Sequence, residues 1–205
     1  MLDDVLISRA IIESYYKEIL DNLESDVIIC GAGPSGLCAS YFLSKEGYKA
    51  VVFERNLRPG GGMPGGGMMF NKIVIEEECQ PLFAELGINT SRYRENYYVA
   101  SSLEATGVLL SQAIKKGARV FNCIAVEDVV IYDKGVEGVV INWSSAAIAG
   151  FHVDPLTLRS SFVVDASGHA AEVARIVSRK SGAKLLTSTG DVIGERPMWA
   201  EKGEK

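Results

Sequence analysis

The chain has 205 residues, 47% of them hydrophobic, and its 21 basic and 26 acidic residues give a net charge of −5. This is enough for one substantial core, or for one main domain with an inserted subdomain, so we expect a single domain over residues 1–205. The acidic balance, with basic residues only in short pairs such as Lys115-Lys116, argues against a nucleic-acid surface.

No apolar run approaches the about 20 residues that span a bilayer, and the N-terminus lacks the layout of a signal peptide. We therefore expect a cytoplasmic protein that does not enter a membrane. The four cysteines are scattered without a C-x-x-C pair, which predicts free thiols.

The first predicted element is an amphipathic helix over residues 8–20, where apolar side chains recur at helical spacing. Its apolar face must pack on something. Tyr15 and Tyr16 belong either to the core or to a subunit interface, and we favour the core because an apolar helix stripe is usually core.

An apolar strand, Asp26–Cys30, then runs into Gly31-x-Gly33-x-x-Gly36 and a helix of small residues. Gly31 allows the tight turn, Gly33 lets backbone N–H groups approach a pyrophosphate, and Gly36 lets the helix pack closely on the strand. This context predicts a dinucleotide site; an ordinary glycine-rich turn is the alternative.

The next strand, residues 48–54, ends at Glu54, where the fingerprint requires an acid. Glu54 is expected to accept hydrogen bonds from ribose hydroxyls and to disfavour a 2′-phosphate. The ligand's adenosine is therefore that of NAD or FAD rather than NADP. Arg55 suits phosphate or stacking on adenine.

Residues 58–69 form a glycine-rich loop with six glycines and two prolines, a composition that excludes both helix and strand. Close approach of a ligand is one reason to collect glycine, and a mobile surface loop or lid is the alternative.

Further along, helices are predicted over residues 72–86 and 102–117, the second ending at Gly117. Strands are predicted over residues 119–125, 126–132, 138–143 and 162–166. This order of elements predicts an α/β fold with a Rossmann-like dinucleotide-binding core, of the FAD/NAD-binding type, and an inserted β-rich portion.

The chain contains two histidines, His152 and His169. In extended backbone His152 and Asp154 project from the same face, and His169 follows a strand whose carboxyl end faces the expected ligand site. Histidine and carboxylate groups are common ligands of Fe(II), but scattered histidines are also often hydrogen-bonded structural groups. Asp165 is a competing carboxylate, which we expect to cap or orient the turn that follows it.

Together these residues resemble the thiamine thiazole synthase family over nearly the whole chain. The matching stretches begin at Gly31, Glu54, Pro59, Val126, Val139, His152 and Ser167. The resemblance implies that NAD is consumed as a substrate and that its ribose carbons are condensed with glycine and sulfur, which gives an adenylated thiazole carboxylate.

The resemblance also implies roles for individual residues. It places Gly31, Gly33, Ser35 and Gly36 near the pyrophosphate, Glu54 and Arg55 near the adenosine, and Gly62, Val126, His152, Val153 and Asp154 along the nucleotide. Asp154 and His169 match the family's iron ligands, which neighbouring protomers can share. The family forms homo-octamers, and Met63, Met68, Met69 and Phe70 are candidates for burial at the contacts.

His152 is a departure from the members that give up their own sulfur, because those members carry cysteine two residues before the aspartate. A histidine cannot donate sulfur, so the chain resembles the sulfide-using, Fe(II)-dependent branch, with His152 as a catalytic proton carrier.

The family also continues past a segment like residues 197–203 into a glycine-rich stretch with an arginine that clasps the glycine carboxylate. Since the sequence ends at Lys205, we expect this C-terminal portion to be absent. Two other functions remain open from the residues: an FAD-dependent oxidoreductase and a non-catalytic nucleotide-binding module.

Overall fold

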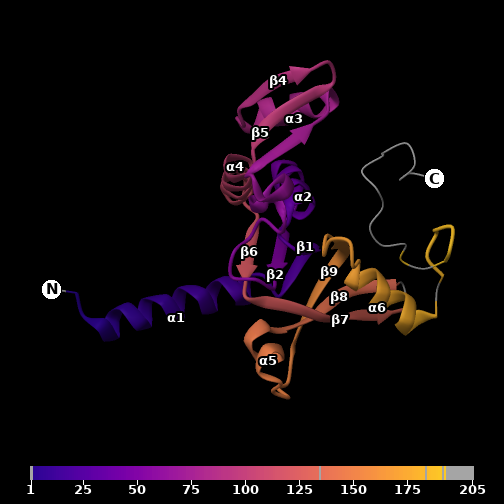
Figure 1. Cartoon of the computed structure of the whole chain (residues 1–205). Coiled ribbons are helices and arrows are strands. Elements are labelled where there is room, and N and C mark those ends of the chain that lie inside the picture. Colours follow the sequence, from indigo (N-terminus) through magenta and orange to yellow (C-terminus); the bar gives the residue numbers. More distant parts are fainter. Residues whose placement is uncertain (1, 134, 183, 191, 193–205) are drawn as a thin grey trace.

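Four parallel strands form the centre of the fold in the computed structural model, which describes residues 2–133, 135–182, 184–190 and 192. The larger sheet has six strands in the order β6-β2-β1-β9-β8-β7 (Figure 1). Strands β6, β2, β1 and β9 run parallel, and β8 and β7 continue the sheet antiparallel. Its strands are β1 (Glu24–Cys30), β2 (Ala50–Glu54), β6 (Arg119–Asn122), β7 (Ile124–Tyr132), β8 (Gly135–Trp143) and β9 (Leu156–Asp165).

A smaller antiparallel sheet, in the order β3-β5-β4, is inserted after β2. It stands at one end of the molecule together with α3 (Figure 1). Its strands are β3 (Lys72–Ile75), β4 (Thr90–Arg94) and β5 (Tyr97–Ser101). The helices are α1 (Asp4–Asp21), α2 (Pro34–Lys45), α3 (Gln80–Leu86), α4 (Ser102–Lys116), α5 (Ser144–Ala149) and α6 (Glu172–Ser181).

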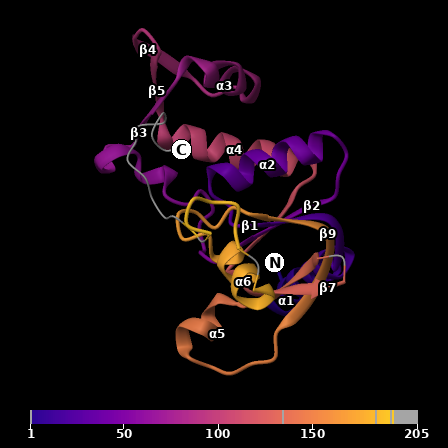
Figure 2. The same ribbon diagram turned by 90° about the vertical axis from the view of Figure 1, so that its right-hand side faces the viewer.

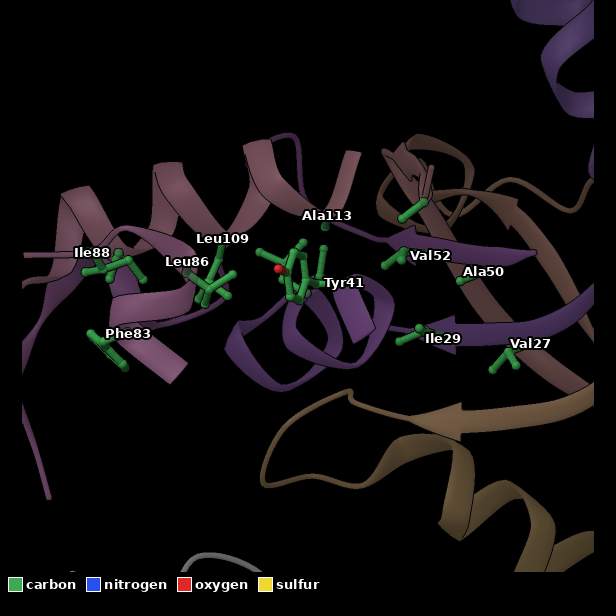
Figure 3. Close-up of a cluster of buried hydrophobic side chains, with 14 of the residues drawn as sticks. Val27, Ile29, Tyr41, Ala50, Val52, Phe83, Leu86, Ile88, Leu109 and Ala113 are labelled. Carbon is green, nitrogen blue, oxygen red and sulfur yellow. The ribbon is translucent and has the colours of Figure 1, made fainter. Parts of the chain in front are cut away.

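The strands of the larger sheet alternate between two apolar layers. Val27 and Ile29 belong to one cluster, which also contains Tyr41 of α2 and Leu109 of α4 (Figure 3). Ile28 and its neighbours face the opposite side, which α6 covers through residues such as Val173. The helices α2 and α4 thus lie on the other side of the sheet from α6 (Figure 2). The expected α/β fold with a Rossmann-like core is confirmed.

The helix predicted over residues 8–20 is present as α1, which Asp3 caps by accepting from the N–H groups of Val5 and Leu6. Our preference for the core was wrong for Tyr16, which is 62% exposed, and holds only in part for Tyr15, which is 40% exposed. No residue of α1 is buried, and the helix extends away from the body of the fold (Figure 1). Only its end packs: Tyr15 meets Phe121 edge-on, with the ring centroids 5.9 Å apart.

The helix predicted over residues 72–86 is correct only in its last part, where α3 (Gln80–Leu86) lies. Its first part is strand β3, where β-branched residues at 73–75 favour extended backbone. Residues 77–79 form a 3-10 turn. The helix α3 begins after this turn, at Gln80, and Pro81 lies in its first turn. Sequence analysis also missed the β4–β5 hairpin, which turns at Asn96 with a φ of 60°.

The other predictions are largely correct. The helix over residues 102–117 is α4, which ends at Gly117 in the left-handed conformation. The boundary between the next two strands falls at Cys123, whose φ is 58°, and β8 and β9 start earlier than predicted. Residues 58–69 contain only two short 3-10 turns, and the four cysteines are free thiols. None of the helices in the described part of the chain is long and apolar enough to cross a membrane.

Candidate functional site

A large pocket opens at the carboxyl ends of β1, β2 and β9. Its volume is about 1350 Å³, and its walls come from the turn after β1, the glycine-rich loop, the start of β7 and the turn after β9. Pockets for drug-sized ligands usually measure about 300–1,000 Å³, so this one is large enough for a dinucleotide. Its place matches the rule that ligands of parallel α/β sheets collect beyond the carboxyl ends of the strands.

The turn after β1 depends on two glycines. Gly31 has a φ of 109°, and a Cβ there would lie 2.4 Å from the carbonyl oxygen of Ala166 in the neighbouring strand segment. A Cβ on Gly36 would lie 1.9 Å from the carbonyl oxygen of Gly31, so only glycine lets α2 approach the turn this closely. Gly36 therefore determines how closely α2 packs on the turn without itself lining the pocket, whereas Gly31, Gly33 and Ser35 line it.

Gly33 is the N-cap of α2, and no side chain caps this end of the helix. The first N–H groups of an α-helix have no partner within the helix, and the helix dipole makes this end electropositive. The turn and the helix end together offer the setting in which proteins bind phosphate groups.

The glycine-rich loop packs directly on this turn. The N–H of Gly60 donates to the carbonyl of Ala32 at 2.7 Å, and a Cβ on Gly61 would lie 3.1 Å from the Cα of Gly33. Gly62 lines the pocket, and nothing lies within 4 Å of where its Cβ would stand. The loop is thus part of the pocket wall, where a ligand could approach its backbone closely.

Glu54 is buried at the end of β2, with 4% of its surface exposed. Its Oε2 accepts from the N–H of Ala32 at 2.9 Å, and its Oε1 accepts from the N–H and the side-chain amide of Asn56 at 2.8 and 2.7 Å. The carboxylate therefore fixes both the turn and the segment after β2. Since each carboxylate oxygen has two acceptor positions, Oε2 can still accept a further hydrogen bond.

Arg55 lines the same pocket, but its guanidinium already has a partner. Its Nη1 donates to Oε1 of Glu172, the first residue of α6, at 2.7 Å. Sequence analysis did not single out Glu172, because the two residues are far apart along the chain and no motif links them.

The turn that carries His169 is held by Asp165 at the end of β9. The carboxylate accepts from the N–H and the hydroxyl of Ser167 at 3.0 and 2.5 Å, and from the N–H of Ala174 in α6 at 2.8 Å. The Ser167 hydroxyl oxygen in turn accepts from the N–H of Glu172 at 2.8 Å. Asp165 thus orients the following turn, as predicted, and His169 lies in the pocket wall.

The other proposed metal ligand lies elsewhere. His152, Val153 and Asp154 are exposed on the segment between α5 and β9, and none of them lines the pocket. Across the described residues, no group of three histidine, cysteine or acidic side chains could hold a metal ion. Asp154 and His169 are suitable donors, but one copy of the described chain does not assemble a complete ligand set from them.

Cys30 is the one cysteine among the residues that line this pocket. Burial, with a further contribution from the Asp165 carboxylate, raises the pKa of its thiol to about 12. The thiolate is the reactive form of cysteine, so at neutral pH Cys30 is inert as a nucleophile.

Known proteins with similar sequences show which family the chain belongs to. The sequence profile of the Thi4 family matches residues 8–205. The chain belongs to the Thi4 family. Two curated Thi4-type relatives are both named thiamine thiazole synthase. The one from Methanothermobacter thermautotrophicus is 52% identical over 203 residues, and the one from Pyrococcus horikoshii is 47% identical over 205 residues.

The alignments cover 99% and 100% of this chain and 79% of each relative. Among solved structures, THI4 from Thermovibrio ammonificans has 44% sequence identity and a TM-score of 0.92, with 99% of this chain and 78% of that one covered. The Thi4 family resemblance inferred from the motifs is therefore confirmed.

More distant structures share only the fold. L-proline dehydrogenase from P. horikoshii has 15% identity and a TM-score of 0.58, covering 77% of this chain and 56% of that one. The FAD-dependent halogenase CndH has 19% identity and a TM-score of 0.56, covering 75% and 39%. They support the Rossmann-like fold class and carry no information about the reaction of this Thi4 chain.

Proposed function

We propose that this chain is a thiamine thiazole synthase that makes an adenylated thiazole carboxylate from NAD, glycine and sulfide with Fe(II). Its Thi4 membership supports an enzyme of thiamine biosynthesis. The observation that carries the proposal is the pocket. Its wall contains the turn at Gly31 and Gly33, where a pyrophosphate would bind, Glu54, which would accept from a ribose, and the turn that bears His169.

In this proposal the nucleotide lies across the carboxyl ends of the strands. The pyrophosphate lies at the N-terminus of α2, and the adenosine lies beside Glu54, Arg55 and Val126, all of which line the pocket. The other end of NAD, whose ribose reacts, extends toward the turn held by Asp165.

The sulfur comes from free sulfide. His152 replaces the cysteine of sulfur-donating members, and Cys30 is protonated and buried, with 3% of its surface exposed. Bound Fe(II) would act as a Lewis acid that holds sulfide beside the reacting sugar carbons. His152 would move protons, and Asp154 and His169 would hold the metal.

A complete metal site requires a second copy of the chain in this proposal, because Asp154 is exposed outside the pocket whose wall carries His169. A homo-oligomer, an octamer by resemblance, supplies that copy. Met68, Met69 and Phe70 are 85%, 89% and 70% exposed, which fits burial against a neighbour. The cytoplasmic location stays a prediction.

The experiment is mass spectrometry of the small molecules released when anaerobically purified protein is denatured, with iron measured on the same sample. An adenylated thiazole or a glycine adduct of ADP-ribose would support the proposal. Released FAD would favour the oxidoreductase function, and binding of NAD without any glycine- or sulfide-dependent product would favour the non-catalytic module.

Asp154→Ala and His169→Ala should each lower iron content and abolish product formation. Asp133→Ala, which removes an exposed aspartate from the turn between β7 and β8, is the matched control and should change neither. Full iron content in both test variants would refute the ligand assignment.

A further inference from the structure

Arg55 is anchored by a residue from a distant part of the chain. It follows β2, whereas Glu172 begins α6, and their side chains meet at 2.7 Å in the wall of the pocket. Both side chains are about half exposed, 56% for Arg55 and 42% for Glu172. The pair is therefore accessible to a ligand in the pocket and partly screened by solvent.

The position of Arg55 leaves the choice of dinucleotide open. An arginine near the strand-ending acid of a Rossmann-like site is the group that accepts the 2′-phosphate of NADP. The acid itself, Glu54, already accepts three hydrogen bonds from Ala32 and Asn56, which stabilise its negative charge. An unpaired Arg55 would offset the repulsion between Glu54 and a 2′-phosphate.

Glu172 changes the net charge that a 2′-phosphate would meet in this part of the pocket. Glu54 and Arg55 have opposite unit charges, so the carboxylate of Glu172 leaves this part of the pocket with one net negative charge. It also occupies Nη1, one of the three guanidinium nitrogens from which a phosphate oxygen could accept a hydrogen bond.

We propose that Glu172 is a specificity-determining residue, which withholds Arg55 from a 2′-phosphate and thereby selects NAD over NADP. The inference rests on the proposed function, in which NAD is the substrate. It assigns discrimination at the adenosine ribose to a residue outside the dinucleotide fingerprint.

The test compares ADP-ribose with 2′-phospho-ADP-ribose by calorimetric titration of the full chain. These probes differ only in the phosphate, and the titration contains neither glycine nor sulfide, so neither probe is converted to product. In the Glu172→Gln variant, which keeps the shape of the side chain and removes its charge, affinity for the 2′-phosphate probe should rise about tenfold relative to ADP-ribose. The gain should shrink at high salt, because the ion pair is half exposed.

Two further variants show whether the effect runs through Arg55. Arg55→Gln alone should widen the preference for ADP-ribose, because Glu54 and Glu172 then repel the phosphate without a counter-charge. In the Arg55→Gln, Glu172→Gln double variant, the gain seen with Glu172→Gln should disappear. Asp128→Asn is the control, since it removes the same charge and breaks a 2.6 Å ion pair with Lys180 of α6 but lies outside the pocket lining.

Each other result overturns the inference in a distinguishable way. If Glu172→Gln strengthens both probes equally, Glu172 only keeps Arg55 from the pyrophosphate. If the unmodified chain binds ADP-ribose and the ratio does not change, Glu172 has no part in discrimination while the proposed function stands. If the unmodified chain binds neither ADP-ribose nor NAD, the proposed function fails together with this inference.

Discussion

The same substitution in two helices should change stability in opposite directions. Gly36 lies in the first turn of α2 and Gly107 in the middle of α4. Glycine to alanine in a helix interior usually stabilises by about 0.5–1 kcal/mol through the lower entropy of the unfolded chain. Nothing lies within 4 Å of a Cβ on Gly107, which is exposed, so Gly107→Ala should show this full gain.

At Gly36 the added methyl group has no room. Its Cβ would lie 1.9 Å from the carbonyl oxygen of Gly31 and 3.2 Å from the Cβ of Ala166. Because the first of these contacts is with backbone, α2 or the turn after β1 must move by more than an ångström. Overpacking of this kind costs about 1–3 kcal/mol or more. We therefore expect Gly36→Ala to be less stable than the unmodified chain by about 1–2 kcal/mol after the helix gain.

Urea unfolding followed by circular dichroism measures the free energy of unfolding of both variants. Calorimetric titration measures their affinity for NAD. For a chain of this size 1 kcal/mol corresponds to a shift in Tm of about 2–4 °C. Gly36→Ala should also weaken NAD binding, since the displaced turn lines the pocket, while Gly107→Ala should not. Equal stabilisation by the two variants would refute the close approach of α2 to the turn and the explanation of the fingerprint's third glycine.

Three further predictions follow from the site and its surroundings. Cys30→Ala should keep sulfide-dependent product formation, and the mass of the intact protein should not fall during turnover; a protein that becomes lighter by one sulfur would contradict the free-sulfide proposal. Hydrogen bonds from Lys45 and then Tyr41 lower the pKa of Glu85, so its contribution to stability is present above the usual carboxyl pKa of about 4.3 and is lost as the pH falls further. Glu85→Gln should therefore lower the urea midpoint more at pH 7 than at pH 3, and an equal loss at both pH values would contradict the charge-based explanation. Light scattering should give an oligomer whose mass falls in Met69→Glu, whereas a monomeric unmodified chain would exclude a shared metal site.

Local patterns were enough to predict the part of the fold that contains β1, the turn after it, α2 and β2. The strand, turn and helix around Gly31 and the acid at Glu54 all lie within a short stretch, where spacing along the chain determines spacing in the structure. The same holds for α4 and its stop at Gly117, and for Asp165, whose partners lie within nine residues of it.

The sequence-based predictions were wrong or incomplete where contacts between residues far apart in the sequence determine the structure. The segment after the glycine-rich loop contains both helical and extended patterns, and pairing with β5 makes residues 72–75 a strand. The periodicity of α1 correctly predicted a helix but could not show that its apolar face lies outside the core of its own chain. Likewise, the partner of Arg55 could not be found from the sequence, because the ion pair forms only when α6 folds back over the ends of the strands.

The contact between the glycine-rich loop and the turn after β1 consists of backbone meeting backbone. Gly60 bonds Ala32, and Gly61 approaches Gly33 with no side chain between them. A side chain introduced on either segment therefore forces the backbone of the other segment to move. The changes in the free energy of unfolding caused by substitutions in the two segments should be non-additive when the substitutions are combined. The effect of a substitution in one segment therefore depends on the residue present in the other. Tolerance to sequence change in this part of the protein has to be measured with double variants, one substitution in each segment.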